Sequence, residues 1–101
     1  MNTQYLAGLV DGEGHITKSP LKSGKGKAYM YTRLIVVQSE KNNGEALVAE
    51  IKDAFGGNVS YTGYNRMWRW QLQGKKAEAL IREMYPHFRV KKAQADMALA
   101  A

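Results

Sequence analysis

Apolar residues recur with helical spacing near the N-terminus of the chain. Leu6, Leu9 and Val10 occupy positions i, i+3 and i+4 within residues 3–11, which predicts a short amphipathic helix. Thr3 precedes this stripe and is the candidate N-cap. The stripe is expected to pack into the core of the helix's own subunit.

The same periodicity predicts three further helices. Asn42 and Glu45 have the spacing of a capping box, so a helix is expected over residues 42–55. Residues 75–85 form the next helical pattern, and residues 90–101 form the last.

Strand patterns separate these helices and pair as two hairpins of one antiparallel sheet. The predicted strands cover residues 15–21, 28–39, 58–63 and 67–73. Their alternation assigns the following residues to the face that the helices cover: Ile16, Leu34, Val36, Val59, Trp68, Trp70 and Leu72. The order α-β-β-α-β-β-α, with one more helix at the end, predicts a single α+β domain over residues 1–101.

Amino-acid composition indicates what kind of partner the chain binds and which chemistry it lacks. The chain has 15 Lys and Arg residues against 9 Asp and Glu, and its pI is near 9.7, which favours a polyanionic partner. Cysteine is absent, which excludes disulfides and zinc sites built on sulfur. Apolar runs are too short for a membrane span and the N-terminus lacks a signal-peptide pattern. We therefore expect an intracellular protein without membrane contact, in a bacterial or phage-host cytoplasm or in an organelle.

The predicted first helix runs directly into two acids. Asp11 and Glu13 are each followed by glycine. The C-terminus of a helix already carries partial negative charge, so carboxylates there do not stabilise the helix. This placement indicates a role for the acids beyond the helix itself.

Residues 6–14 read LAGLVDGEG and resemble the signature of the LAGLIDADG homing endonucleases. Six of the nine positions match the family name, and Val10, Gly12 and Glu13 replace Ile, Ala and Asp. The α-β-β-α-β-β-α order is similar to the family core over nearly the whole chain. The single copy of the motif implies the homodimeric branch of the family.

The resemblance implies an intron-encoded, site-specific endonuclease. Such an enzyme makes metal-dependent double-strand breaks, with short 3′ overhangs, in a long and nearly palindromic DNA target. The two-fold symmetry of a homodimer would place one half-site on each subunit.

A metal site is expected where two copies of Glu13 meet. Two neighbouring carboxylates repel each other unless a cation lies between them, and Mg²⁺ prefers oxygen ligands. The resemblance implies that the Glu13 carboxylate and the Gly12 carbonyl are the metal ligands. Mg²⁺ is the expected cofactor, Mn²⁺ a substitute, and Ca²⁺ an ion that supports binding without cleavage.

Gln38 and Lys91 join Glu13 in the catalytic set that the resemblance implies. Gln38 matches the polar residue at the end of the second strand that organises active-site water. Lys91 matches the lysine near the start of the last helix, whose ammonium would stabilise the transition state or acidify water. A register shifted by one residue would make Lys92 the catalytic lysine, and the sequence leaves this choice open.

The glycines of the motif predict the dimer interface. Gly8 and Gly12 lie four residues apart, which lets two backbones approach closely. Asp11 is also assigned to hold the end of the helix. The predicted interface residues are Ala7, Gly8, Asp11 and Gly12.

The sheet face opposite the helices is the predicted DNA-binding surface. Arg33 and Arg69 can contact guanine in bidentate fashion, and Gln71 and Gln73 can contact adenine. Alternation places these residues on that face: Thr17, Ser19, Tyr29, Tyr31, Arg33, Ile35, Ser60, Thr62, Arg69, Gln71 and Gln73. Phosphate contacts are expected from residues in or beside turns, namely Lys22, Lys25, Lys27 and Arg66.

Two other functions remain open on the sequence alone. The first is an RNA-splicing maturase or a non-cleaving DNA-binding regulator on the same fold. The second is a basic interaction module whose motif match is accidental. Glu13 favours the nuclease, because a protein that only binds has no need for an acid directed at phosphate.

Overall fold

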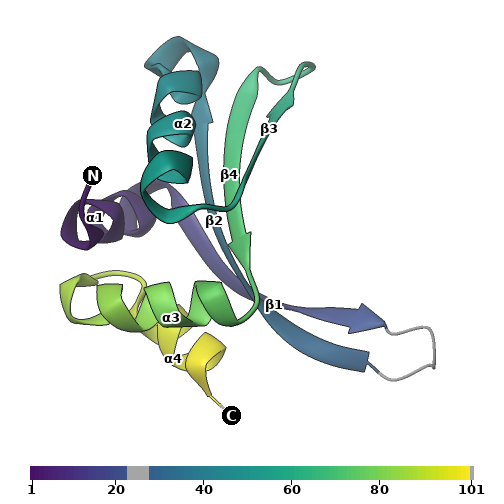
Figure 1. Ribbon diagram of the computed structural model, residues 1–101, viewed down its shortest axis with the longest axis vertical. Coiled ribbons are helices and arrows are strands. Elements are labelled where there is room, and N and C mark those ends of the chain that lie inside the picture. Colours follow the sequence, from purple (N-terminus) through teal and green to yellow (C-terminus); the bar gives the residue numbers. More distant parts are fainter. Residues whose placement is uncertain (23–27, 101) are drawn as a thin grey trace.

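The structure is a computed structural model that describes residues 1–22 and 28–100. Its element order confirms the predicted α+β topology (Figure 1). The elements are α1 (Thr3–Glu13), β1 (Gly14–Lys22), β2 (Ala28–Ser39), η1 (Glu40–Asn42), α2 (Gly44–Phe55), β3 (Asn58–Thr62), β4 (Met67–Gln73), α3 (Lys75–Met84), η2 (Tyr85–His87) and α4 (Lys92–Leu99).

One antiparallel sheet carries the fold, with strand order β1-β2-β4-β3. Leu34 is registered opposite both Ile16 and Leu72, so these three side chains share the face beneath the helices. The four α-helices lie on this side (Figure 1). The opposite side, which we call the open face, is concave and lies between the β3–β4 hairpin and the far end of the β1–β2 hairpin (Figure 1).

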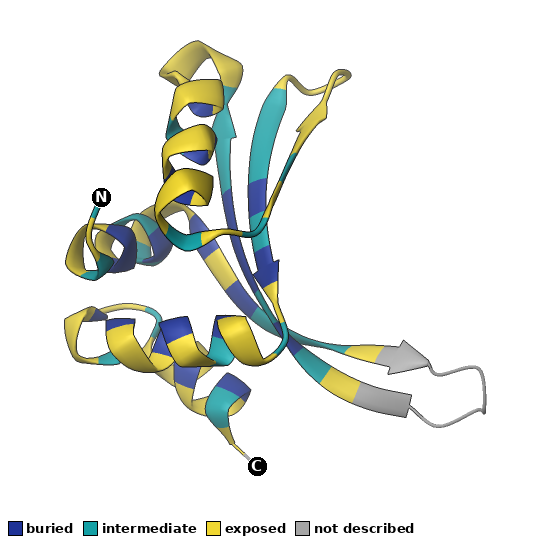
Figure 2. Ribbon diagram, viewed as in Figure 1, coloured by how far each residue is buried: buried dark blue, intermediate teal, exposed yellow. Residues whose placement is uncertain are grey.

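The core lies between the sheet and the helices (Figure 2). Trp70 at the centre of the sheet has no exposed surface, and its indole N–H donates to the Gly56 carbonyl at 2.7 Å. Leu6 and Val10 of α1 are also fully buried, as their spacing predicts. The third residue of the predicted stripe, Leu9, is only half-buried.

The helix starts differ from the sequence prediction. Asn2, not Thr3, is the N-cap of α1, and its side chain accepts the N–H of Tyr5 at 2.8 Å. The predicted capping box at Asn42 does not form. Instead Asn43 adopts the left-handed conformation with φ 58°, and α2 begins at Gly44, where a Cβ would lie 2.5 Å from the Gln38 carbonyl oxygen.

The C-terminal helix is shorter than predicted but is well anchored. The Thr32 hydroxyl is buried and lies 3.3 Å from both the Ala98 carbonyl oxygen and Glu78 Oε1. Lys18 Nζ donates to the Ala100 carbonyl at 2.8 Å. These contacts hold α4 against β1 and β2.

Candidate active site and nucleic-acid interface

Glu13 lies at the junction of α1 and β1. It is the last residue of the helix, two residues beyond the predicted end, and it is exposed. Gly14 follows at a buried position where a Cβ would lie 2.6 Å from the Val10 Cα. Only glycine fits this turn, so the chain passes from the helix directly into the sheet and leaves Glu13 at the surface of the junction.

Asp11 has a different environment from Glu13. Its carboxylate accepts the backbone N–H groups of Arg89 at 2.8 Å, Val90 at 3.2 Å and Lys91 at 3.0 Å. Lys91 is the residue that precedes α4, so Asp11 satisfies donors at the start of that helix. The predicted structural role of Asp11 therefore takes a specific form: it fastens α1 to the start of α4.

The same contacts control the ionisation of Asp11. Burial on its own would raise the pKa of this carboxyl. The three backbone N–H donors and the positive charge of Lys91 outweigh burial, so the pKa of Asp11 lies below its ordinary value of 3.8. Asp11 is consequently a carboxylate whose hydrogen-bonding capacity serves its own chain.

The two candidate lysines have different surroundings. The charge of Lys91 lies close enough to Asp11 to lower its pKa, and the side chain is half-buried. The Lys92 ammonium lies 5.8 Å from the centre of the Tyr85 ring. Lys92 also lines a depression of about 560 Å³ together with Gln4, Gly8 and Asp11 of α1. Lys91 is therefore the lysine whose charge acts on Asp11, two residues before Glu13.

Gln38 makes contacts within its own segment. It is registered opposite Trp68, on the sheet face that carries the helices. Its Oε1 accepts the backbone N–H of Ser39 at 2.9 Å and lies 3.5 Å from Asn42 Nδ2. In this arrangement the Gln38 carbonyl oxygen stabilises the turn into η1.

The oxygen donors of the single chain suit a cation that is completed by further ligands rather than a closed metal site. Among the described residues, no three His, Cys, Asp or Glu side chains gather into a metal site. Gly12 and Glu13 are both exposed at the end of a helix, where carbonyl groups are left without helical partners. These oxygen donors fit Mg²⁺ or Ca²⁺, provided that a second subunit or phosphate oxygens supply the remaining ligands.

The exposed side of α1 is formed by its glycines. A Cβ at Gly8 or Gly12 would meet no atom within 4 Å, so this surface is open in the single chain. Ala7 has no exposed surface, and Asp11 is turned toward residues 89–91. The prediction that Ala7 lies at the dimer interface therefore needs correction, because its side chain is buried in the core of the single chain.

The register places the predicted reading residues on the open face. Arg33 is paired with Thr17 and Gln73, and Arg69 is paired with Ser60, so these residues lie on the side opposite Leu34 and Trp70. The remaining members on that face are Ser19, Tyr31, Ile35, Thr62 and Gln71. Arg66 is exposed in the β3–β4 turn with φ 54°. Lys25 and Lys27 lie outside the described residues, as do the side chains of Lys22 and Tyr29.

Two exposed polar residues of the open face were missed. His15 is registered opposite Ile35, and Asn58 is registered opposite Gln71. Both are exposed. Each stands two positions from a residue that was assigned correctly, so extending the alternation to the first residue of each strand would have found them.

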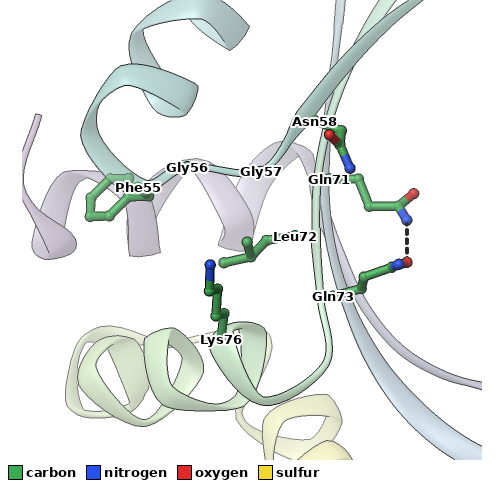
Figure 3. Close-up of a pocket in the computed structure, with 8 residues that line it drawn as sticks. All are labelled: Phe55, Gly56, Gly57, Asn58, Gln71, Leu72, Gln73 and Lys76. Carbon is green, nitrogen blue, oxygen red and sulfur yellow. Dashed lines mark hydrogen bonds between the residues drawn. The ribbon is translucent and has the colours of Figure 1, made fainter.

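Side chains on this face form a continuous polar network. Gln71 Oε1 accepts hydrogen bonds from Arg33 Nη2 at 2.7 Å and from Arg69 Nη2 at 2.9 Å. Gln71 Nε2 donates to Gln73 Oε1 at 3.0 Å. Figure 3 shows the two glutamine side chains on the side of β4 that faces away from Leu72 and Lys76.

An antiparallel sheet covered on one side, with a cationic and amide-rich opposite face, is typical of proteins that lay a sheet into a nucleic-acid groove. The sequence model of the family described as "LAGLIDADG endonuclease" matches residues 6–96. The chain belongs to the LAGLIDADG endonuclease family. A search of curated proteins finds no significant match.

Solved structures with the same fold include homing endonucleases. The structure of I-CvuI in complex with its target, in the presence of Ca, superposes with a TM-score of 0.82 at 24% identity, over 96% of this chain and 62% of that chain. I-TnaI gives 0.68 at 17%, over 91% and 64%. I-LtrWI bound to target DNA gives 0.68 at 20%, over 89% and 31%. The chain thus spans about three fifths of the length of I-CvuI.

None of the described helices has both the length and the apolar character that crossing a bilayer requires.

Proposed function

We propose that the chain is a homodimeric, divalent-metal-dependent endodeoxyribonuclease that cuts both strands of a long, nearly palindromic DNA site. Membership of the endonuclease family supports the reaction class. The observation that carries the proposal is the placement of Glu13, which is exposed at the end of the motif helix. There an acid can face phosphate without a cost to the core.

Pairing through α1 completes the site. Gly8 and Gly12 offer an open helix surface, so two copies of α1 can approach closely around a two-fold axis. Their C-terminal ends then lie side by side and bring two Glu13 carboxylates together. This arrangement gives each subunit one strand to cut.

The chain would hold the metal through the Glu13 carboxylate and the Gly12 carbonyl. A bound Mg²⁺ supplies charge neutralisation at phosphate and an acidified water. Lys91, set at the start of α4 by Asp11, places a cation beside the same end of the helix. Such a charge stabilises the additional negative charge of the phosphate in the transition state.

The open face supplies recognition. Its arginine and glutamine side chains offer donors and acceptors for base edges, while Arg66 and the lysines of the first hairpin contact phosphate. A sheet that follows the groove on each side of the two-fold axis gives a long target with two half-sites.

Cleavage of a randomised duplex library with Mg²⁺, followed by sequencing of the cut ends, tests this proposal. The expected result is a single, nearly palindromic family of sites whose two cuts leave short 3′ overhangs. Selective binding without cleavage would contradict the nuclease and favour a regulator. An absence of duplex binding, with binding of structured RNA instead, would favour a maturase.

A further inference from the structure

Two arginines of the open face converge on one neutral oxygen. Arg33 projects from β2 and Arg69 from β4, and both donate to Gln71 Oε1, at 2.7 and 2.9 Å. An amide oxygen has two lone pairs, so both are used. Among the side chains that the structure describes, no carboxylate accepts a hydrogen bond from either guanidinium.

The orientation of the Gln71 amide is fixed by its second contact. Its NH₂ group donates to Gln73 Oε1 at 3.0 Å (Figure 3). This contact leaves the carbonyl oxygen to accept from the arginines. The opposite orientation would set the NH₂ group against two guanidinium groups, donor against donor. Gln73 thus supports Gln71, and Gln71 orders the arginines.

Both arginines lie along the sheet rather than extending from it. Arg33 Nε and Arg69 Nε are buried and have no hydrogen-bond partner. Ile35, registered opposite Gln71, is only 7% exposed although it lies on the open face. The side chains around it therefore form a packed layer over the centre of the sheet.

Two features of this layer are energetically unfavourable in the free chain. A buried N–H group without a partner is unfavourable, and two like charges around one neutral oxygen repel each other. A ligand that presents several acceptors to the remaining N–H groups of the two guanidinium groups offsets the repulsion between their charges. The major-groove edge of guanine presents O6 and N7 in the geometry that a guanidinium matches.

The backbone positions of the two arginines alone would not bring them together. Arg33 is registered opposite Gln73, which stands four residues after Arg69 in β4. At the usual strand rise this separation is roughly 13 Å, or about four base pairs along a duplex. The shared hydrogen bonds to Gln71 draw the guanidinium groups together over a much shorter span.

We propose that Gln71 is a positioning residue that joins Arg33 and Arg69 into one reading unit for neighbouring guanines in each half-site. This inference rests on the proposed function, because it presumes a duplex on the open face. Without the Gln71 oxygen, each arginine would contact bases independently of the other. Recognition at the two positions is then coupled in the natural protein and uncoupled when the oxygen is removed.

Binding measurements in Ca²⁺ test the coupling without any need for cleavage. The natural protein first selects a duplex from a randomised library. The positions read by each arginine are those at which Arg33→Ala or Arg69→Ala loses discrimination. Single and double base-pair substitutions at these positions are then titrated with the natural protein and with Gln71→Ala. The salt dependence of binding to an unrelated duplex is recorded for both.

The natural protein is expected to read neighbouring positions, and the double substitution is expected to cost less than the product of the two single losses. In Gln71→Ala, discrimination at both positions falls by about 10-fold or more. The affinity loss caused by the double base-pair substitution then equals the product of the two single losses. The salt dependence does not change, since both cations remain. Gln94→Ala is the control, because it removes an exposed amide from α4, on the other side of the sheet; its discrimination at both positions is expected to match that of the natural protein.

Two further variants separate positioning from simple packing. Gln71→Glu keeps the shared acceptor and is expected to preserve the coupling at lower overall affinity, because it adds negative charge to the face. Gln71→Asn keeps the amide but shortens the side chain by one methylene, so it is expected to lose the coupling. It replaces Gln71→Ala as the test if that variant does not fold. Melting temperatures identify folded variants.

The outcomes distinguish this inference from the proposed function. If the natural protein selects a duplex and Gln71→Ala keeps the same discrimination at both positions, the positioning role is wrong and the nuclease proposal stands. The same holds if the positions read by the two arginines lie about four base pairs apart. If the natural protein selects no duplex, the proposed function fails and this inference fails with it.

Discussion

The carboxylate of Asp11 accepts the backbone N–H of Lys91 at 3.0 Å, although 80 positions separate the two residues in the chain. The contact joins the helix that ends at Glu13 to the helix that begins after Lys91. One acid of the motif therefore positions a candidate catalytic lysine, while the other remains exposed for ligands. This division of roles answers why two acids stand at the end of one helix.

Replacing Asp11 should weaken the fold by a measurable amount. Asp11→Ala leaves the N–H groups of residues 89–91 without their acceptor and is expected to cost about 2 kcal/mol of unfolding free energy, in the range of lost helix caps. Chemical denaturation measures this loss. Asp53→Ala removes an exposed carboxylate from α2 and should change stability by less than about 0.5 kcal/mol. Equal losses in both variants would contradict the capping role.

The contribution of Asp11 should depend on pH in a defined direction. The pKa of Asp11 is lower in the folded chain than its ordinary value of 3.8, so the ionised form stabilises the fold. That stability is present above pH 3.8 and is lost as the pH falls through the lower, folded-state pKa. The difference in unfolding free energy between the natural protein and Asp11→Asn should therefore shrink below pH 3.8. A difference that grows with acidity would show that the sign is wrong.

Lys91 and Lys92 should differ in their effects on cleavage. Lys91→Ala is expected to slow single-turnover cleavage by about 10²–10³-fold, the usual effect of removing a group that stabilises transition-state charge. The Lys92 ammonium lies 5.8 Å from the centre of the Tyr85 ring, so Lys92→Ala should slow cleavage far less. Binding in Ca²⁺ shows whether either variant loses affinity instead. A larger cleavage defect in Lys92→Ala would reverse the assignment.

A large side chain at Gly8 should separate the subunits without unfolding them. The chain itself leaves open space at this position, so Gly8→Leu is compatible with the folded subunit and blocks close approach of a second α1. Sedimentation equilibrium should show a shift from dimer to monomer. Ala79→Leu, at an exposed position of α3, should remain dimeric. A Gly8→Leu protein that stays dimeric would place the interface elsewhere.

Residue alternation and helical periodicity predicted most of the fold because they reflect local geometry. The two faces of the sheet follow from a strict period of two, so Arg33, Arg69 and Trp70 were assigned to the correct sides. Helix ends were less accurate, since Asn43 adopts a left-handed conformation that favours no capping box. Glycine disfavours helices, so the predicted first helix ended at residue 11, whereas α1 continues to Glu13.

The site depends on contacts that no local pattern contains. Nothing near Asp11 in the sequence indicates that its acceptors serve residues 89–91, because the contact spans almost the whole chain. The burial of Ala7 likewise depends on how α1 lies against its neighbours. The shared acceptor at Gln71 depends on side-chain conformations that alternation does not specify. These three features of the site therefore depend on packing between residues that lie far apart in the chain.

The central claim is that Glu13 holds the metal at the scissile phosphate, and Glu13→Gln tests it most directly. The amide keeps the shape of the side chain but removes its charge, so cleavage in Mg²⁺ should fall below detection while specific binding in Ca²⁺ stays within a few-fold of the natural protein. Glu83→Gln, an exposed glutamate of α3, is the matched control and should cleave normally. Normal cleavage by Glu13→Gln would contradict the account.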